Sequence, residues 1–308
     1  MKQTTQHIMM VRPASFGYNT QTAISNAFQH KVTDAELQEA QQKALAEFDG
    51  FVAELRKHGV KVNVIFDSEE PKKPDAIFPN NWITMHADGS IVLYPMYAPN
   101  RRWERRRSII DLLKTHYQII KEYDLSVYEE ENKFLEGTGS MIFDRINKIC
   151  YACLSVRTDK SLLEKFCQIY EYTPVVFTSV DASGKEIYHT NVMMSVAEKY
   201  AVICLESIRD SKEREHVVNT LKKTNKEIID ITLEQVNHLC GNVIELTNDK
   251  GESLLVMSEQ SYKAFRPEQL AQIQKYSKIV YAPLYTIEKI GGGGARCMIA
   301  EIFLPEKN

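Results

Sequence analysis

Three reactive side chains stand at comparable places along this chain, each just before a segment with strand character. Cys297 ends the run Gly291-Gly-Gly-Gly-Ala-Arg-Cys297, His189 opens His-Thr-Asn191, and Glu136 opens Glu-Gly-Thr-Gly139. Nucleophilic catalysis by sulfur requires a thiolate, a group that accepts and donates protons, and a group that orients it. The glycines before Cys297 allow the backbone to bend closely around a ligand and to point amides at developing charge. These residue types indicate a cysteine nucleophile assisted by histidine and glutamate.

Taken one at a time, the same residues have ordinary structural interpretations. A glycine run is more often a mobile loop than a site, and a cysteine in an apolar segment is usually core. A single histidine is more often a structural hydrogen-bonding group, and Glu136 could be a solvated turn residue. What favours chemistry is a repeat that puts all three at the same position of successive units.

The order of hairpin, helix and strand recurs along the chain. Asp88-Gly89, between two apolar runs, marks the first hairpin, because Asp-Gly is a strong hairpin signal. Thr33-Asp-Ala-Glu36 is a capping box that predicts the start of a helix, with Gly59 as its stop. Further hairpins are expected within 140–154, 192–205 and 243–257, helices near 160–171, 211–223 and 259–275, and strands at 174–177, 227–231 and 279–281.

The period of this repeat is close to 50 residues. The first strands of the units open at intervals of 58, 52, 51 and 55 residues, near Asn81, Gly139, Asn191, Asn242 and Cys297. A fifth unit requires Met298–Leu304 to pair with the N-terminal strand Ile8–Val11. Such a period indicates a solenoid or a closed array, and closure leaves no open sheet edge. We predict one α/β domain, residues 1–308: a five-bladed α/β propeller of five ββαβ units about a pseudo-fivefold axis, with a pocket where the first strands begin.

The composition excludes several functional classes. With 308 residues, a net charge of −3 and scattered lysines and arginines, the chain lacks a basic surface typical of nucleic-acid binding. It has neither an apolar run long enough to span a membrane nor the apolar segment of a signal peptide, so we expect a cytoplasmic protein without a membrane partner. Histidines and cysteines lack metal-ligand spacing and no nucleotide motif follows a strand, so no metal or cofactor is expected. Four cysteines are expected to be buried core residues: Cys150, Cys153, Cys167 and Cys204.

These segments together resemble the guanidino-group-modifying superfamily, which comprises arginine deiminases, dimethylarginine dimethylaminohydrolases and amidinotransferases and shares the five-bladed propeller, or pentein, fold. The resemblance extends along nearly the whole chain. Gly291–Cys297 resembles the nucleophile loop of that superfamily. Glu136–Gly139 resembles its acidic-Gly-Gly segment, although a glycine stands where a second acidic residue is usual. Arg157, in Leu-Ser-Val-Arg-Thr, resembles the arginine that binds a substrate carboxylate, and Pro-Asn-Arg101-Arg102 resembles another substrate-facing segment.

Two departures from the superfamily concern the residues that hold a guanidinium. The Phe-x-Arg-Asp segment appears here as Phe78-Pro-Asn-Asn81, and His-x-Asp appears as His189-Thr-Asn191. A guanidinium is cationic and only donates hydrogen bonds, so carboxylates suit it, whereas a ureido group is neutral and also carries an acceptor oxygen. Because asparagine has both a donor and an acceptor, the changes favour a ureido substrate. Asn81 followed by Trp82 is similar to the citrulline-utilization hydrolase branch.

The resemblance implies a cysteine hydrolase of a ureido or guanidino side chain that takes a small amino acid as substrate. We expect Cys297 to attack the ureido carbon of citrulline, and His189 to protonate the leaving nitrogen and then activate water, while Glu136 orients His189 or the leaving amine. The products would be ornithine, carbon dioxide and ammonia. The expected substrate-binding residues at the ureido end are Asn191 and either Asn81 or its neighbour Asn80, with Asn81 preferred by the resemblance. At the α-carboxylate we expect Arg157, together with Arg101 or Arg102.

Two alternatives remain open. The first is action on a guanidinium, by an arginine deiminase, a dimethylarginine dimethylaminohydrolase or an amidinotransferase. The second is a non-catalytic amino-acid-binding protein, which would not need the intact set of Cys297, His189 and Glu136. The sequence is compatible with a homodimer.

Overall fold

The structure, a computed structural model, describes residues 2–26, 28–31 and 33–307. Within these residues five three-stranded sheets occur, and each combines an antiparallel strand pair with a third strand parallel to the middle one. The predicted domain, residues 1–308, includes four residues outside this description, namely 1, 27, 32 and 308. The predicted α/β class and its five ββαβ units are confirmed.

The bounds of the elements follow the predicted repeat closely. The first unit contains β3 (Ile83–Met85), β4 (Ser90–Leu93), α2 (Arg107–His116) and β5 (Lys121–Asp124). The second contains β6 (Ile142–Asp144), β7 (Ile149–Cys153), α4 (Lys160–Tyr170) and β8 (Thr173–Phe177). The third contains β9 (Met194–Val196), β10 (Tyr200–Ile203), α6 (Ser211–Lys223) and β11 (Glu227–Asp230). The fourth contains β12 (Ile244–Thr247), β13 (Ser253–Ser258), α8 (Glu259–Ala264), α9 (Pro267–Gln274) and β14 (Lys278–Ala282).

The fifth sheet joins segments from the two ends of the chain. Its strands are β15 (Ala300–Glu301), β1 (His7–Arg12) and β2 (Lys61–Phe66), and β1 pairs antiparallel with β15 as predicted. The C-terminal strand is shorter than the expected Met298–Leu304. Beyond it, Ile302 donates to the carbonyl of His7 in β1 and also forms an isolated bridge with Met85 of the first sheet. Between β1 and β2 runs α1 (Asp34–Lys57), which begins at the predicted capping box.

The fourth unit differs from the prediction at its helix. Residues 259–275 were expected to form one helix, but the chain breaks at Phe265 and Arg266 and restarts with Pro267 at the first position of α9. A proline has no N–H to donate and disfavours helical backbone in the residue before it, so it suits the start of a new helix rather than the middle of one.

The burial of the cysteines and of the apolar face of α1 agrees with the prediction from the sequence. All six cysteines are buried and unpaired, including the four that were predicted as core. The apolar stripe of α1 is fully buried, with Ala44, Phe48, Phe51 and Leu55 each at 0% exposure. Among the described residues no helix is long and apolar enough to cross a membrane.

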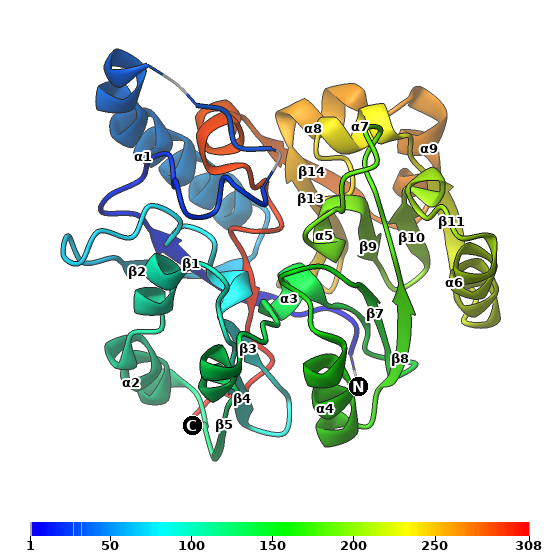
Figure 1. Cartoon of the computed structure of the whole chain (residues 1–308), viewed down its shortest axis with the longest axis horizontal. Coiled ribbons are helices and arrows are strands. Elements are labelled where there is room, and N and C mark those ends of the chain that lie inside the picture. The colour runs from blue at the N-terminus through cyan, green and yellow to red at the C-terminus, as the bar shows by residue number, and fades with distance from the viewer. Residues whose placement is uncertain (1, 27, 32, 308) are drawn as a thin grey trace.

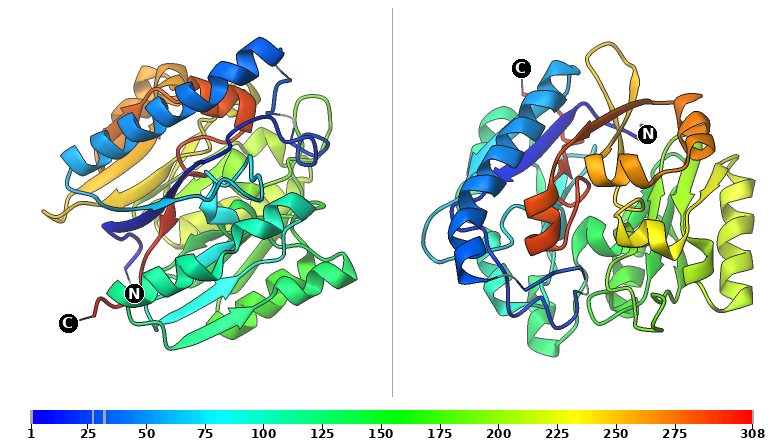
Figure 2. Two further views of the ribbon diagram at one scale, coloured as in Figure 1. Left: turned by 90° about the vertical axis from the view of Figure 1, so that its left-hand side faces the viewer. Right: turned by 90° about the horizontal axis from the view of Figure 1, so that it is seen from above.

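The long helices lie at the periphery, whereas the openings of the units meet inside. Figure 1 shows α1, α2, α4 and α6 around the outside and the short helices α3 (Gly137–Ser140) and α5 (Thr190–Met193) between them. Seen from above, α1 and α6 lie on opposite sides of the molecule (Figure 2, right). The segments just before the first strands of neighbouring units pack tightly against each other. A Cβ on Gly241, before the fourth unit, would overlap the backbone carbonyl oxygen of Val192 in the third unit.

Gly241→Ala should therefore destabilise the protein, by about 2 kcal/mol, because overfilling a packed site typically costs 1–3 kcal/mol. The matched control is Gly50→Ala in α1, where a Cβ meets no atom within 4 Å. That change should raise stability by roughly 0.5–1 kcal/mol, the usual gain from alanine in a helix. Urea unfolding of both variants measures the difference, and equal stabilities would contradict the close approach.

Candidate active site

A small cavity lies where the first segments of the units meet, and the loop after β1 covers it with Thr22 and Asn26. Five predicted site residues line it: Cys297, His189, Asn81, Arg101 and Arg157. Glu136 is fully buried against His189, and Asn191 is buried in contact with Cys297. The structure thus brings most of the predicted residues together from separate units of the repeat.

The side-chain NH2 groups of two asparagines donate hydrogen bonds to the sulfur of Cys297. Nδ2 of Asn191 lies 3.3 Å from Sγ, and Nδ2 of Asn242 lies 3.1 Å from it. Burial raises the pKa of the Cys297 thiol, while the amides of Asn242 and Asn191 and the charge of Arg296 act to lower it. Asn242 was predicted only as the opening of the fourth unit, and its residue type at that repeat position was the available signal.

His189 is held by Glu136 through a 2.8 Å hydrogen bond at Nε2. Glu136 also accepts from the backbone N–H of Tyr97 at 2.9 Å. Burial acts to raise the pKa of Glu136, but the effects of Arg157 and His189 are larger and lower this pKa to about 2. Burial lowers the pKa of His189 to about 4, against the opposing effect of Glu136. Since a carboxylate only accepts, Nε2 carries the proton of the neutral ring, which leaves Nδ1 able to accept another.

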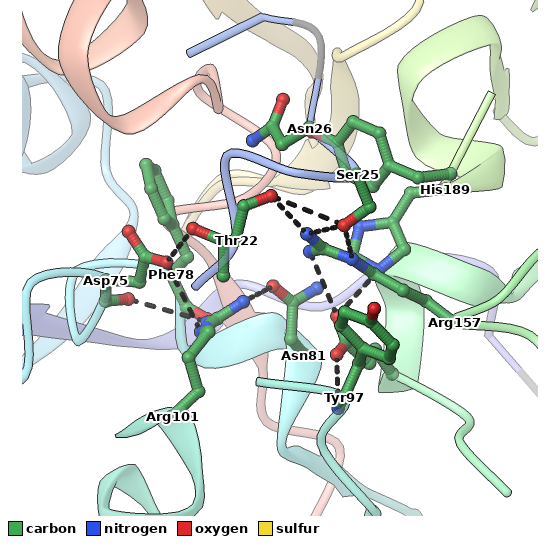
Figure 3. A network of polar contacts seen from close by, with 12 residues as sticks. Thr22, Ser25, Asn26, Asp75, Phe78, Asn81, Tyr97, Arg101, Arg157 and His189 are labelled. Carbon is green, nitrogen blue, oxygen red and sulfur yellow. Dashed lines mark hydrogen bonds and ion pairs between the residues drawn. The ribbon is translucent and has the colours of Figure 1, made fainter. Parts of the chain in front are cut away.

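Asn81 is fixed by Arg101 (Figure 3). Nη1 of Arg101 donates to Oδ1 of Asn81 at 2.8 Å, and Nδ2 of Asn81 is buried without a hydrogen-bond partner. The rest of the Arg101 guanidinium donates to both carboxylate oxygens of Glu104, at 2.8 and 2.9 Å, and to the carbonyl of Phe78. Arg101 therefore lines the cavity with its donors largely occupied.

Arg157 lies at another side of the cavity, against the covering loop. The Cζ atom of its guanidinium lies 4.7 Å from the centre of the Tyr188 ring. The guanidinium also donates to the carbonyl of Thr22 at 3.0 Å and to Oγ of Ser25 at 2.6 Å. Figure 3 shows these contacts between Arg157 and the loop. The loop thus supplies neutral partners to an arginine that a substrate carboxylate would also suit.

Asp75 is a lining residue that the sequence analysis missed. Its Oδ2 accepts from Asn19 at 2.8 Å and from Thr22 at 3.0 Å, while Oδ1 is buried without a partner. Burial raises the pKa of Asp75, and nearby Arg101 opposes this. Because Asp75 stands in a loop between sheets, no periodic pattern marks it in the sequence.

Two predicted substrate-binding residues lie away from the cavity surface. The amide of Asn80 is fully buried, without a hydrogen-bond partner, and does not line the cavity. Arg102 instead donates to the carbonyl of Met96 and pairs with Glu129. Among the residues that the structure describes, no three or more His, Cys, Asp or Glu side chains are grouped so that they could bind a metal.

Comparison with known proteins adds to this geometry. The chain matches, over residues 12–304, the family described as N,N dimethylarginine dimethylhydrolase, eukaryotic. The substrate-bound N-terminal domain of ArgZ, an arginine dihydrolase from the ornithine-ammonia cycle in cyanobacteria, has a TM-score of 0.75 and 14% identity, over 97% of this chain and 98% of that one.

Two further solved structures extend the comparison. Apo ArgZ has a TM-score of 0.74 and 16% identity over 97% of this chain, which spans only 41% of the ArgZ chain. A dimethylarginine dimethylaminohydrolase adduct with S-methyl-L-thiocitrulline has a TM-score of 0.66 and 15% identity, over 97% and 100% of the two chains. At these identities the structures show a shared fold. No curated protein matches the chain.

The raised pKa of Cys297 predicts slow alkylation at neutral pH. The rate of modification by iodoacetamide should keep rising beyond about pH 8.5, the ordinary pKa of a thiol, because only the thiolate reacts. Asn242→Leu removes one N–H donor to the sulfur and should slow the reaction further at pH 8.

Mass spectrometry of the Cys297 peptide measures this rate, and Cys297→Ser shows the background from the other five buried cysteines. A rate that levels off below pH 8 would mean that the thiol is already ionised in the free protein.

Proposed function

Because this chain belongs to the N,N dimethylarginine dimethylhydrolase family, we propose that it is a cysteine hydrolase of the C–N bond at the end of an amino-acid side chain, with citrulline as its substrate. The observation that supports citrulline is the amide character of the head of the cavity. Asn191 and Asn242 contact the sulfur of Cys297, and Asn81 lines the cavity together with Cys297. A neutral ureido group suits these amides, whereas a guanidinium would favour carboxylates in the same places.

The two charged groups on the α-carbon of an amino-acid substrate would find partners of opposite charge. The α-carboxylate suits Arg157, whose present partners in the loop, Thr22 and Ser25, are neutral. The α-ammonium suits the unpartnered Oδ1 of Asp75. A substrate held in this way places its head group toward Cys297, because all three residues line one cavity.

In the proposed reaction His189 accepts the thiol proton of Cys297 at Nδ1, and the thiolate attacks the ureido carbon. The bond from this carbon to the side-chain nitrogen breaks, and the imidazolium protonates that nitrogen as ornithine leaves. The carbamoyl group remains on the sulfur. His189 then takes a proton from water, which attacks the carbamoyl carbon and restores the thiol. The released carbamate yields carbon dioxide and ammonia, and Glu136 stabilises the imidazolium in both steps.

A second candidate function is hydrolysis of a guanidinium, as in arginine or dimethylarginine. Two observations favour it: the family description names dimethylarginine, and Asp75 provides a buried carboxylate with a free oxygen. The two candidates share Cys297, His189 and Glu136, so they differ in the head group that reacts rather than in the nucleophile.

The protein should release ornithine from citrulline, and Cys297→Ala should abolish the release. Purified protein is incubated separately with citrulline, arginine and N,N-dimethylarginine, and ornithine, citrulline and dimethylamine are quantified by mass spectrometry. Turnover of arginine or dimethylarginine without turnover of citrulline would favour the second candidate. Ornithine release by Cys297→Ala would refute the cysteine mechanism.

Asn191→Asp should shift the substrate preference toward a cation. A carboxylate beside the sulfur attracts a guanidinium and loses the N–H donor that Asn191 directs at Sγ. We expect kcat/KM for citrulline to fall by about tenfold or more, since each 1.4 kcal/mol corresponds to a factor of ten, while kcat/KM for arginine rises or falls less. An equal loss for both substrates would argue against the role of this amide in selecting the head group.

A further inference from the structure

The chain just before Cys297 is a segment that needs contacts from elsewhere to hold one course. It contains four consecutive glycines, Gly291–Gly294. Glycine has the widest range of backbone conformations and therefore loses the most freedom when it is fixed. Gly292 takes up the left-handed conformation, with φ at 67°. The position of the Cys297 sulfur thus depends on what holds the glycine loop, residues 291–294.

Three side chains of the described residues donate hydrogen bonds to carbonyl groups of the glycine loop. Nε2 of Gln29 lies 3.1 Å from the carbonyl oxygen of Gly291, and Nδ2 of Asn26 lies 3.3 Å from that of Gly292. The hydroxyl of Tyr188 lies 3.1 Å from the same Gly292 oxygen. Burial raises the pKa of Tyr188, so the hydroxyl keeps its proton and donates. Because a peptide unit is planar, this bond also fixes the plane of the peptide that follows Gly292.

Tyr188 differs from the other two donors in its neighbours. Asn26 and Gln29 belong to the loop after β1, whereas Tyr188 comes directly before His189, and the centres of the Tyr188 and His189 rings lie 4.7 Å apart. The Cζ atom of Arg157 lies 4.7 Å from the centre of the Tyr188 ring. Tyr188 is buried and lines the cavity. One side chain therefore contacts the residue assigned to proton transfer, the residue assigned to the substrate carboxylate, and the loop that leads to the nucleophile.

The nucleophile and its proton acceptor are aligned indirectly. In the described part of the chain no hydrogen bond joins His189 to Cys297. Instead, residues on either side of His189 bond to the segment of the nucleophile: Asn191 to Sγ at 3.3 Å, and Tyr188 to the carbonyl of Gly292. Proton transfer requires the two reacting groups to reach hydrogen-bond distance, and a misplacement of about 1 Å can slow a reaction roughly a hundredfold. The contact of Tyr188 with the loop therefore bears on the rate of the chemical step.

We propose that Tyr188 is a positioning residue, whose hydroxyl holds the glycine loop and Cys297 in register with His189 and whose ring supports the guanidinium of Arg157. This rests on the proposed function, in which Cys297 gives its proton to His189. The two contacts have separable effects. Loss of the hydroxyl slows the chemical step, because the loop loses a hydrogen bond while Arg157 keeps its aromatic neighbour. Loss of the ring weakens substrate binding as well.

The first test separates the hydroxyl from the ring by steady-state kinetics. In Tyr188→Phe, kcat for citrulline should fall about three- to tenfold, the net effect of one hydrogen bond, while KM stays within about twofold. Tyr188→Leu also removes the ring beside Arg157, so KM should rise by about three- to tenfold in addition, as expected for a lost cation–π contact.

The second test needs no turnover and measures the loop in the free protein. Cys297 is only 6% exposed, so a less firmly held loop should make its sulfur more accessible. The rate of alkylation of Cys297 by iodoacetamide should rise about three- to tenfold in Tyr188→Phe, again the effect of one hydrogen bond. The other five cysteines, which are also buried, should react as in the wild type. A general loss of structure would instead raise the rates of all six together.

The matched control is Tyr200→Phe, which removes the same hydroxyl from another buried tyrosine. Tyr200 has 0% exposure, and its hydroxyl donates to Oγ of Ser277 at 2.9 Å, between the third and fourth units and outside the cavity lining. This variant should keep the kcat, the KM and the Cys297 alkylation rate of the wild type.

The outcomes distinguish this inference from the proposed function. If the wild type turns over arginine but not citrulline, the proposed substrate is wrong and the same kinetic comparison is made with arginine. If the wild type turns over neither, the proposed function is wrong and the alkylation rates alone decide on Tyr188. Unchanged kcat and unchanged Cys297 alkylation in Tyr188→Phe would overturn the positioning role, and so would an equal rise at all six cysteines. A rise in KM alone would also overturn it, because the hydroxyl would then act on the substrate rather than on the loop.

Discussion

The buried carboxylate of Glu136 connects the parts on which the cavity depends. It has no exposure to solvent, yet it is matched by the backbone N–H of Tyr97, by His189 and by Arg157. An isolated buried charge would be costly, and these partners offset that cost. Because His189 is assigned to proton transfer and Arg157 to the substrate carboxylate, one anion fixes both the chemical and the binding side of the cavity. Loss of this charge would leave Arg157 buried without its anionic partner.

In the free protein the Cys297 thiol and the His189 ring are both uncharged near neutral pH. Burial raises the pKa of the Cys297 thiol and lowers that of His189 to about 4, so neither group is charged near pH 7. In the proposed mechanism the cysteine–histidine ion pair would therefore form only in the substrate complex, where the substrate displaces water and the two amides support the thiolate. The same neutrality agrees with a neutral head group, since a charged thiolate in the free site would attract a cation.

The predicted site residues agree best with the structure where the prediction came from the sequence repeat. Cys297, His189 and Glu136 were predicted together because each precedes the first strand of a unit, and sheets built from local hairpins keep that register. The prediction failed where a single contact outweighs the pattern. Arg102 faces Glu129 although its neighbour Arg101 lines the cavity, because consecutive residues point in different directions. Asp75, in a loop without a repeat signal, and the atoms that each asparagine presents could be assigned only from their three-dimensional partners.

The pairing of β1 with β15 determines when the active site can exist during synthesis on the ribosome. β1 precedes the four other sheets along the chain, whereas its antiparallel partner β15 follows Cys297 and all four of those sheets. Until β15 has been synthesised, the edge of β1 that meets it lacks that partner. Because Cys297 lies just before β15, the pairing that completes the fifth sheet also holds Cys297 beside Asn191 and Asn242.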